Sequence, residues 1–130
     1  MSLGLYLHIP YCFSKCRYCD FYSAPGQRGV PRAYVDALLR ELSRFAPDAP
    51  LRPDTLYFGG GTPSLLDPAD AARLIAAAQP LPGAEITLEA NPETVTEDSL
   101  RAFREAGANR ISFGVQSARD SQLKTLGRPH

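Results

Sequence analysis

Three cysteines lie close together near the start of the chain, and they are the residues best suited to bind a metal. Cys12, Cys16 and Cys19 form a Cys-x3-Cys-x2-Cys pattern, and the sequence contains no other cysteine. An odd number of cysteines cannot pair completely within one chain, and such tight spacing in a reducing compartment indicates a metal site. Thiolates are soft ligands that suit iron–sulfur clusters or zinc.

The spacing leaves two metal sites open. A cubic four-iron cluster has four corners, so three thiolates would leave one iron open to an external ligand, as catalytic metal sites do. Alternatively, the three cysteines and His8, four residues before Cys12, could bind a single zinc ion. His8 could also be a buried histidine beside the site.

Further along the chain, glycines and isolated polar residues have two interpretations each. Gly59, Gly60 and Gly61 precede Thr62, and they would let the backbone approach a small molecule or form a tight turn. They do not match the spaced glycines of a dinucleotide or P-loop fingerprint. Three candidates remain. Glu89 is a site residue or a solvated strand-end carboxylate, and Gln116 is a site residue or a turn former. Arg128 is a carboxylate clamp or a surface cation.

Short apolar runs alternate with amphipathic patterns, and this alternation must position the candidate residues. Strands are expected at residues 3–9, 55–58, 85–90 and 110–115. Helices are expected at 31–46 and 68–79, then from the Thr96 cap to about Ala106, and finally from Ser117 to Gly127. The predicted strands and helices alternate and are joined by short connections, an arrangement that favours right-handed crossovers between parallel strands. The predicted fold class is therefore α/β.

All the candidate residues except Arg128 lie at or just after the carboxyl end of a predicted strand. The carboxyl ends of parallel strands share one rim, where ligands bind in β/α folds. Four strands are too few for a closed barrel, which needs eight strands and about 250 residues. Because the chain ends at His130 without a following strand, we expect a fragment whose sheet is completed by further sequence.

Composition excludes several classes of protein. The chain has 130 residues, enough for one domain, and its 14 basic and 14 acidic side chains cancel. A nucleic-acid binder should show a basic excess, so none is expected as a partner. No apolar run reaches the roughly 18 residues of a membrane span, and the start lacks the features of a secretion signal. We therefore expect a soluble cytoplasmic protein.

Taken together, these residues resemble the radical S-adenosylmethionine (SAM) superfamily, whose signature is Cys-x3-Cys-x2-Cys after the first strand of its barrel. Tyr18 occupies the usual aromatic place before the last cysteine. Four segments resemble one branch of that superfamily: Tyr6-Leu7-His8-Ile9-Pro10, Tyr57-Phe58-Gly59-Gly60-Gly61-Thr62-Pro63, Leu88-Glu89-Ala90-Asn91-Pro92 and Ser112-Phe113-Gly114-Val115-Gln116-Ser117. The resemblance implies that residues 1–130 are the N-terminal portion of a partial TIM-like barrel.

The resemblance also implies cofactors and their ligands. Cys12, Cys16 and Cys19 would hold a [4Fe-4S] cluster, and the amino and carboxylate groups of SAM would chelate the open iron. The other implied SAM contacts are Tyr6, Tyr18 near the adenine, backbone at Gly60, Gly61 and Thr62 near the amino end, Glu89 at that end or the ribose, Gln116 at the ribose and Arg128 at the carboxylate.

Within this branch, oxygen-independent coproporphyrinogen III dehydrogenases and the HemW family of heme chaperones are the alternatives. The dehydrogenases carry a fourth cysteine two residues after the third, where this chain has Phe21, and a long segment before the first strand. Both departures favour the heme chaperones, which bind heme and pass it to acceptor proteins. Oxidative decarboxylation of coproporphyrinogen is therefore disfavoured. The second alternative is a zinc-stabilised α/β binding module. The sequence leaves open whether the protein is a homodimer.

Overall fold

The structure is a computed structural model that describes residues 2–12, 29–114, 119, 121 and 122. Within these residues four strands alternate with three α-helices. In chain order the elements are β1 (Gly4–Ile9), α1 (Arg32–Phe45), β2 (Thr55–Gly60), the 3₁₀ turn η1 (Pro63–Leu65), α2 (Pro68–Ala78), β3 (Glu85–Ala90), the 3₁₀ turn η2 (Pro92–Thr94), α3 (Glu97–Ala106) and β4 (Arg110–Phe113).

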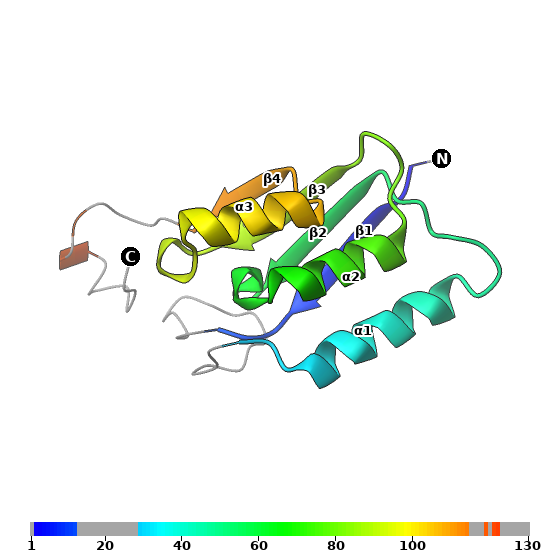
Figure 1. The fold of residues 1–130 in the computed structure, drawn as a ribbon, viewed down its shortest axis with the longest axis horizontal. Coiled ribbons are helices and arrows are strands. Elements are labelled where there is room, and N and C mark those ends of the chain that lie inside the picture. Colours follow the sequence, from blue (N-terminus) through cyan, green and yellow to red (C-terminus); the bar gives the residue numbers. More distant parts are fainter. Residues whose placement is uncertain (1, 13–28, 115–118, 120, 123–130) are drawn as a thin grey trace.

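The four strands form one parallel sheet in the order β1-β2-β3-β4. The register places His8 beside Gly59 and Glu89 beside Ser112. All three α-helices lie on the same face of this sheet (Figure 1). The α/β fold predicted from the alternating patterns is therefore confirmed, with one covered face and one face that no described helix covers.

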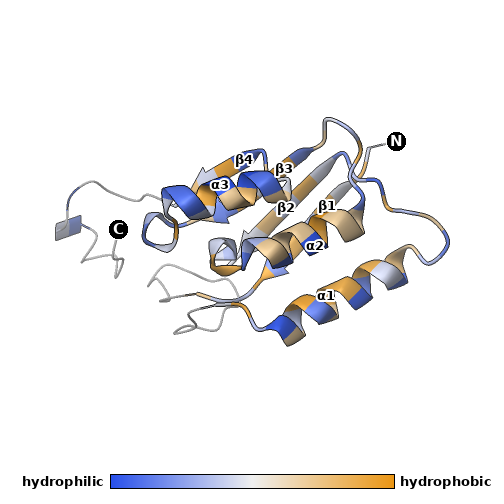
Figure 2. Ribbon diagram, in the orientation of Figure 1, coloured by the Kyte–Doolittle hydropathy of each residue, from blue (hydrophilic) through white to orange (hydrophobic). Residues whose placement is uncertain are grey.

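The helix-covered face contains the hydrophobic core. Since side chains alternate along a strand, every second strand residue points toward the helices. The buried core residues are Leu7, Ile9, Leu56, Phe58, Ile86 and Leu88 from the strands and Val35, Leu42, Leu74, Ile75 and Phe103 from the helices. α2 is largely hydrophobic, whereas α3 presents many hydrophilic residues to solvent (Figure 2). The central position of α2 between the other two helices accounts for this difference.

Local capping determines where the helices begin and end. The Asp67 carboxylate accepts a hydrogen bond from the Ala69 N–H at 2.9 Å and starts α2. Thr96 and Ser99 form a reciprocal capping box at the start of α3. Gly107, with a φ of 123°, ends α3 in a conformation that favours glycine. The predicted Thr96 cap and the predicted helix end near Ala106 are confirmed.

Several predicted boundaries were wrong in detail. β2 continues through Gly60 because the pairing with β1 extends to the Ile9–Gly60 pair. α2 ends at Ala78, since Gln79 adopts a left-handed conformation as its cap. β4 ends at Phe113, although the Gly114 N–H still donates to the Ala90 carbonyl at 2.9 Å. Phe45 is the last residue of α1, and its side chain is 75% exposed because the helix ends there. The helix predicted from Ser117 to Gly127 lies almost entirely outside the described residues.

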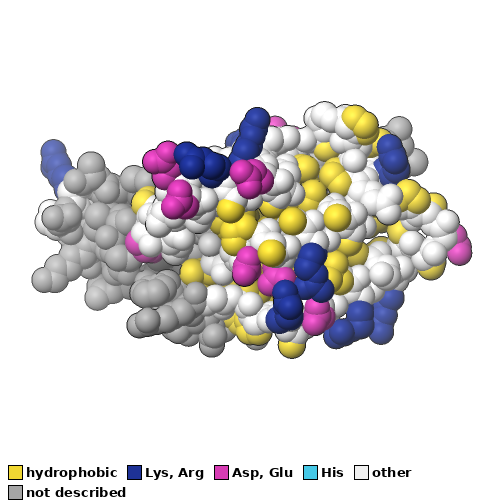
Figure 3. Space-filling view, in the orientation of Figure 1, with side chains coloured by type: hydrophobic (Ala, Val, Ile, Leu, Met, Phe, Trp, Pro, Cys, Tyr) yellow, Lys and Arg dark blue, Asp and Glu magenta, His cyan; other side chains and the backbone are white. Residues whose placement is uncertain are grey.

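Ion pairs join the first two helices near the rim. Asp70 on α2 is 6% exposed and pairs with Arg32 at 3.4 Å and with Arg73 at 3.0 Å. Arg73 also reaches Asp36 on α1 at 3.0 Å. Figure 3 shows this group of basic and acidic side chains on the helix layer. The network holds α1 against α2 at the end where the cysteine segment rejoins the fold.

Candidate functional site at the carboxyl ends of the strands

The structure brings together those predicted site residues that it describes. Cys12 follows β1, Gly60 ends β2 and is followed by Gly61 and Thr62, and Glu89 lies near the end of β3. The predicted site residues that lie outside the described part are Cys16, Cys19, Tyr18, Gln116 and Arg128.

Cys12 is held against the glycine segment after β2. The Gly61 N–H donates to the Ile9 carbonyl at 2.8 Å, and the Thr62 N–H donates to the Tyr11 carbonyl at 2.6 Å. Cys12 is 5% exposed. A Cβ atom on Gly61 would lie 2.8 Å from Cys12 Sγ and 2.5 Å from the Tyr11 carbonyl oxygen. Because Gly61 has no side chain, the Cys12 thiol can pack beside the end of β2. A thiol held in this way is suited to be a ligand of a metal cluster.

The Glu89 carboxylate lies over the glycine backbone. Its Oε1 atom accepts a hydrogen bond from the Gly60 N–H at 3.1 Å. A Cβ atom on Gly59 would lie 2.6 Å from this oxygen and 2.8 Å from the rings of both Tyr57 and Tyr6. Gly59 thus leaves the space into which a carboxylate and two aromatic rings converge.

Tyr6 and Tyr57 stack on each other beside the Glu89 carboxylate. The rings of Tyr6 and Tyr57 are 5.9 Å apart and nearly parallel, at 13°. The Tyr6 hydroxyl is also 3.3 Å from His8 Nδ1. Partial burial, and then the charge of Glu89, raise the pKa of both tyrosines above the ordinary value of 10.0. Both tyrosine hydroxyl groups are therefore neutral at physiological pH.

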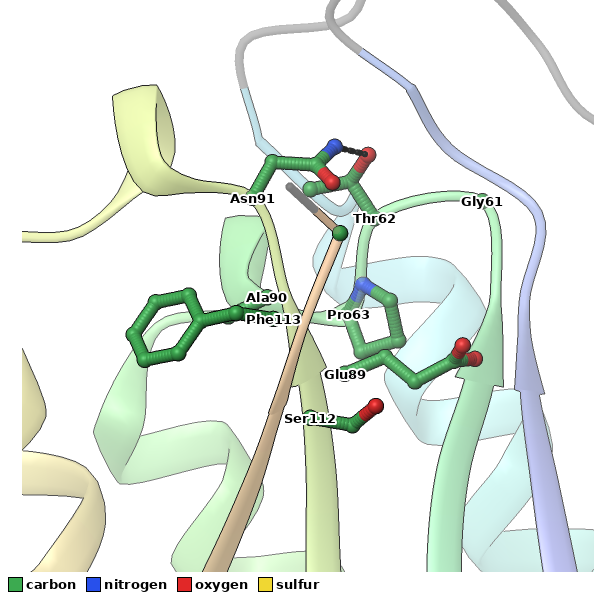
Figure 4. A pocket seen from close by; sticks show the side chains of 9 residues that line it. Gly61, Thr62, Pro63, Glu89, Ala90, Asn91, Ser112 and Phe113 are labelled. Carbon is green, nitrogen blue, oxygen red and sulfur yellow. Dashed lines mark hydrogen bonds between the residues drawn. The ribbon is translucent and has the colours of Figure 1, made fainter. Parts of the chain in front are cut away.

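A cavity of about 80 Å³ opens beside this carboxylate. Its walls come from the ends of β2, β3 and β4: Gly61, Thr62, Pro63, Glu89, Ala90, Asn91, Ser112, Phe113 and Gly114. The Asn91 side-chain amide donates to the Thr62 hydroxyl at 3.1 Å (Figure 4). The Ser64 and Thr94 hydroxyl groups share a further hydrogen bond between η1 and η2. The Glu89 carboxylate in its wall suits a group that donates hydrogen bonds, such as an ammonium.

The backbone of the glycine segment is already hydrogen-bonded in a way that restricts how it can meet a ligand. The N–H groups of Gly60, Gly61 and Thr62 donate to Glu89, Ile9 and Tyr11, respectively. An ammonium group donates hydrogen bonds and needs acceptors. The Glu89 carboxylate is such an acceptor, and backbone carbonyl groups are the others that this segment can provide.

The sequence analysis assigned no ligand contact to Tyr57, Ser112 or Asn91, although the motif segments contain all three. Period-two alternation could have found Tyr57, since it lies two residues before Gly59 and shares its face of the sheet. Ser112 is level with Glu89 on the next strand, a register that no sequence pattern specifies.

The described residues include no group of three His, Cys, Asp or Glu side chains placed to hold a metal ion. A full ligand set needs Cys16 and Cys19, so neither the cluster nor the zinc alternative is tested by this finding. Among the helices in the described ranges, none is both long and apolar enough to cross a membrane.

Comparison with known sequences gives the family. The pattern of the radical SAM superfamily matches residues 6–130. The chain belongs to the radical SAM superfamily. Within this superfamily, the chain is 48% identical to the heme chaperone HemW of Escherichia coli and 40% identical to HemW of Haemophilus influenzae. It is also 40% identical to the mitochondrial radical S-adenosyl methionine domain-containing protein 1 of Bos taurus.

These alignments cover nearly all of this radical SAM chain but a minor part of each relative. Each includes 98% of this chain, against 35%, 36% and 30% of the three relatives, respectively. The chain thus spans about a third of the length of the curated relatives that it matches.

A solved structure of another superfamily member has the same fold. Coproporphyrinogen III oxidase (HemN) from Escherichia coli, described as a radical SAM enzyme, superimposes with a TM-score of 0.87 at 33% sequence identity. The match covers 99% of this chain and 31% of that chain. The predicted resemblance to this branch of the superfamily is confirmed.

Proposed function

We propose that residues 1–130 form the N-terminal part of the core of a heme chaperone that carries a [4Fe-4S] cluster and SAM. The observation that carries the proposal is the buried Cys12 thiol packed against Gly61, together with the Glu89 carboxylate bonded to the preceding Gly60. A thiolate and a carboxylate at one rim suit a soft metal and the ammonium end of an amino acid, respectively.

Cys12, Cys16 and Cys19 would hold the cluster and leave one iron for the amino and carboxylate groups of SAM. A bound cluster would supply single-electron chemistry to the sulfonium of SAM, while this chain's residues would hold both groups in place.

The remaining residues of this chain would bind and orient the cofactor. Glu89 would accept hydrogen bonds from the ammonium group or the ribose, and Tyr6 would cover one side of the cofactor. Tyr18, Gln116 and Arg128 would contact the adenine, the ribose and the carboxylate, as the resemblance implies.

Heme is the proposed cargo, to be delivered to acceptor proteins. The higher identity to HemW than to HemN supports this choice, as does Phe21 in place of a fourth cysteine. Coproporphyrinogen decarboxylation is the second candidate, supported by the superposition on HemN. The cytoplasmic location, the absence of a nucleic-acid partner and the homodimer stay predictions from the sequence.

Anaerobic reconstitution with iron and sulfide tests the metal centre. We expect a brown protein with about four irons per chain, whose electron paramagnetic resonance spectrum changes when SAM is added. Cys12→Ala should lose most of the iron. A colourless protein with one zinc would favour the zinc-stabilised binding module instead. An electron paramagnetic resonance spectrum that does not change when SAM is added would contradict binding of SAM at an open iron.

Titration with heme tests the cargo separately. Saturable binding with a shift of the heme absorption band is the expected result, followed by transfer to an apo acceptor. Decarboxylation of coproporphyrinogen by the reconstituted chain, without heme binding, would favour the second candidate.

A further inference from the structure

The segment from His8 to Cys12 is fixed by contacts on both of its sides. On the β2 side, the Ile9 and Tyr11 carbonyl groups accept hydrogen bonds from Gly61 and Thr62. Because backbone carbonyl groups alternate in direction along an extended strand, the His8 carbonyl points to the other side, away from β2.

Tyr34, in the first turn of α1, makes the contacts on that other side. Its hydroxyl donates to the His8 carbonyl at 2.5 Å, across 26 residues of sequence. Its ring packs edge-on against the ring of Tyr11, with the centroids 5.4 Å apart and the planes at 79°. Burial raises the pKa of Tyr34, so the hydroxyl keeps the proton that it donates.

Tyr34 is itself firmly placed by its helix. The next residue, Val35, is fully buried in the core. Arg32, at the start of the same helix, pairs with Asp70 on α2 at 3.4 Å. The hydroxyl of Tyr34 therefore reaches the strand from a fixed support rather than from a free loop.

We propose that Tyr34 is a positioning residue for the metal centre. It acts through the backbone from His8 to Cys12. Its contacts hold this backbone against the glycine segment, so that the Cys12 thiol stays buried at the carboxyl ends of the strands. The inference rests on the proposed role of Cys12 as a cluster ligand.

The rate of cluster loss tests this role. Wild type, Tyr34→Phe and Ser43→Ala would be reconstituted anaerobically, and the decay of visible absorbance would be followed after addition of an iron chelator. Tyr34→Phe removes the hydrogen bond and keeps the ring. Since one hydrogen bond is lost, we expect cluster loss to be about two- to tenfold faster than in wild type.

Ser43→Ala is the matched control on the same helix. Its hydroxyl donates to the Leu39 carbonyl at 3.2 Å, at the other end of α1, so it removes a side-chain-to-backbone hydrogen bond away from the metal. Cluster loss in this variant should equal that of wild type. The unfolding midpoint of each apo protein in denaturant is the second measurement, and it should be lowered no more by Tyr34→Phe than by Ser43→Ala.

Each other outcome overturns the proposal in a distinguishable way. Equal cluster loss in wild type and Tyr34→Phe would overturn the positioning role and leave the proposed function standing. Equally accelerated loss in Ser43→Ala, or an unfolded apo Tyr34→Phe, would assign Tyr34 a general structural role instead. Wild type that takes up no iron would overturn the proposed function and this inference together.

Discussion

The two faces of the sheet are made by the same strands but differ in chemistry. Toward the helices, β1 and β2 present Leu7, Ile9, Leu56 and Phe58, all of them nearly or fully buried. Toward the other face, the same two strands present Tyr6, His8, Tyr57 and Gly59.

This difference separates stability from ligand binding. Burial of apolar side chains supplies most of the favourable free energy of folding, and here it is confined to one face. The opposite face and the rim carry polar groups, such as Glu89, that can bind a ligand. A substitution on one face should therefore change a different measurable property from a substitution on the other.

Adjacent residues of β2 give the largest contrast in stability. Phe58, at 1% exposed, lies in the core, and Phe58→Ala should lower the free energy of unfolding by about 3–5 kcal/mol. Tyr57→Ala, one position away on the open face, should cost clearly less. Denaturant titrations followed by circular dichroism measure both, and equal costs would break the comparison.

At the rim, Gly61→Ala should chiefly affect the metal. The new Cβ would meet the Tyr11 carbonyl oxygen at 2.5 Å, and backbone cannot move aside as freely as a side-chain end. Overpacking of this kind costs about 1–3 kcal/mol, which corresponds to about five- to 150-fold weaker cluster retention. Iron content after dialysis against a chelator measures the effect. Gly29→Ala is the control, since its Cβ would meet nothing within 4 Å, and equal iron loss in both variants would contradict the prediction.

The smallest expected effect is on the titration of the open face. Glu89→Gln removes a negative charge that raises the pKa of Tyr6 and Tyr57, so both pKa values should fall. The pKa of Tyr6 should stay above 10.0, because burial is the largest cause of its shift and is unchanged by the substitution. Tyrosine-labelled NMR titration measures each ring, and Tyr34 is the internal control because Glu89 is not among the causes of its shift.

The raised pKa values of Tyr6 and Tyr57 also predict how the stability of the fold changes at high pH. A tyrosine pKa that is raised in the folded state stabilises the fold fully below about pH 10, and this contribution is lost as the pH rises through the folded pKa. Glu89→Gln should therefore lose less stability at alkaline pH than wild type. A steeper alkaline loss in the variant would contradict the assigned direction.

Much of the fold could be predicted because its signals are local. Asp67 and Thr96 mark helix starts through hydrogen bonds to residues two and three positions away. The apolar alternation of the strands and the cysteine spacing are equally local. The extension of β2 through Gly60 could not be predicted, since it depends on pairing with β1, far away in the sequence.

By itself, the sequence determined the alternation of strands and helices, the side of each strand that faces the core, and the residue types able to bind a metal and an ammonium group. Only the tertiary structure decided that Gly61 packs against Cys12, that Gly60 donates to Glu89 and that Tyr34 reaches His8. The physical reason is the range of the interactions. Propensity, capping and side-chain alternation act within a few residues, whereas these contacts join segments that become neighbours only when the parallel sheet and its helices have assembled.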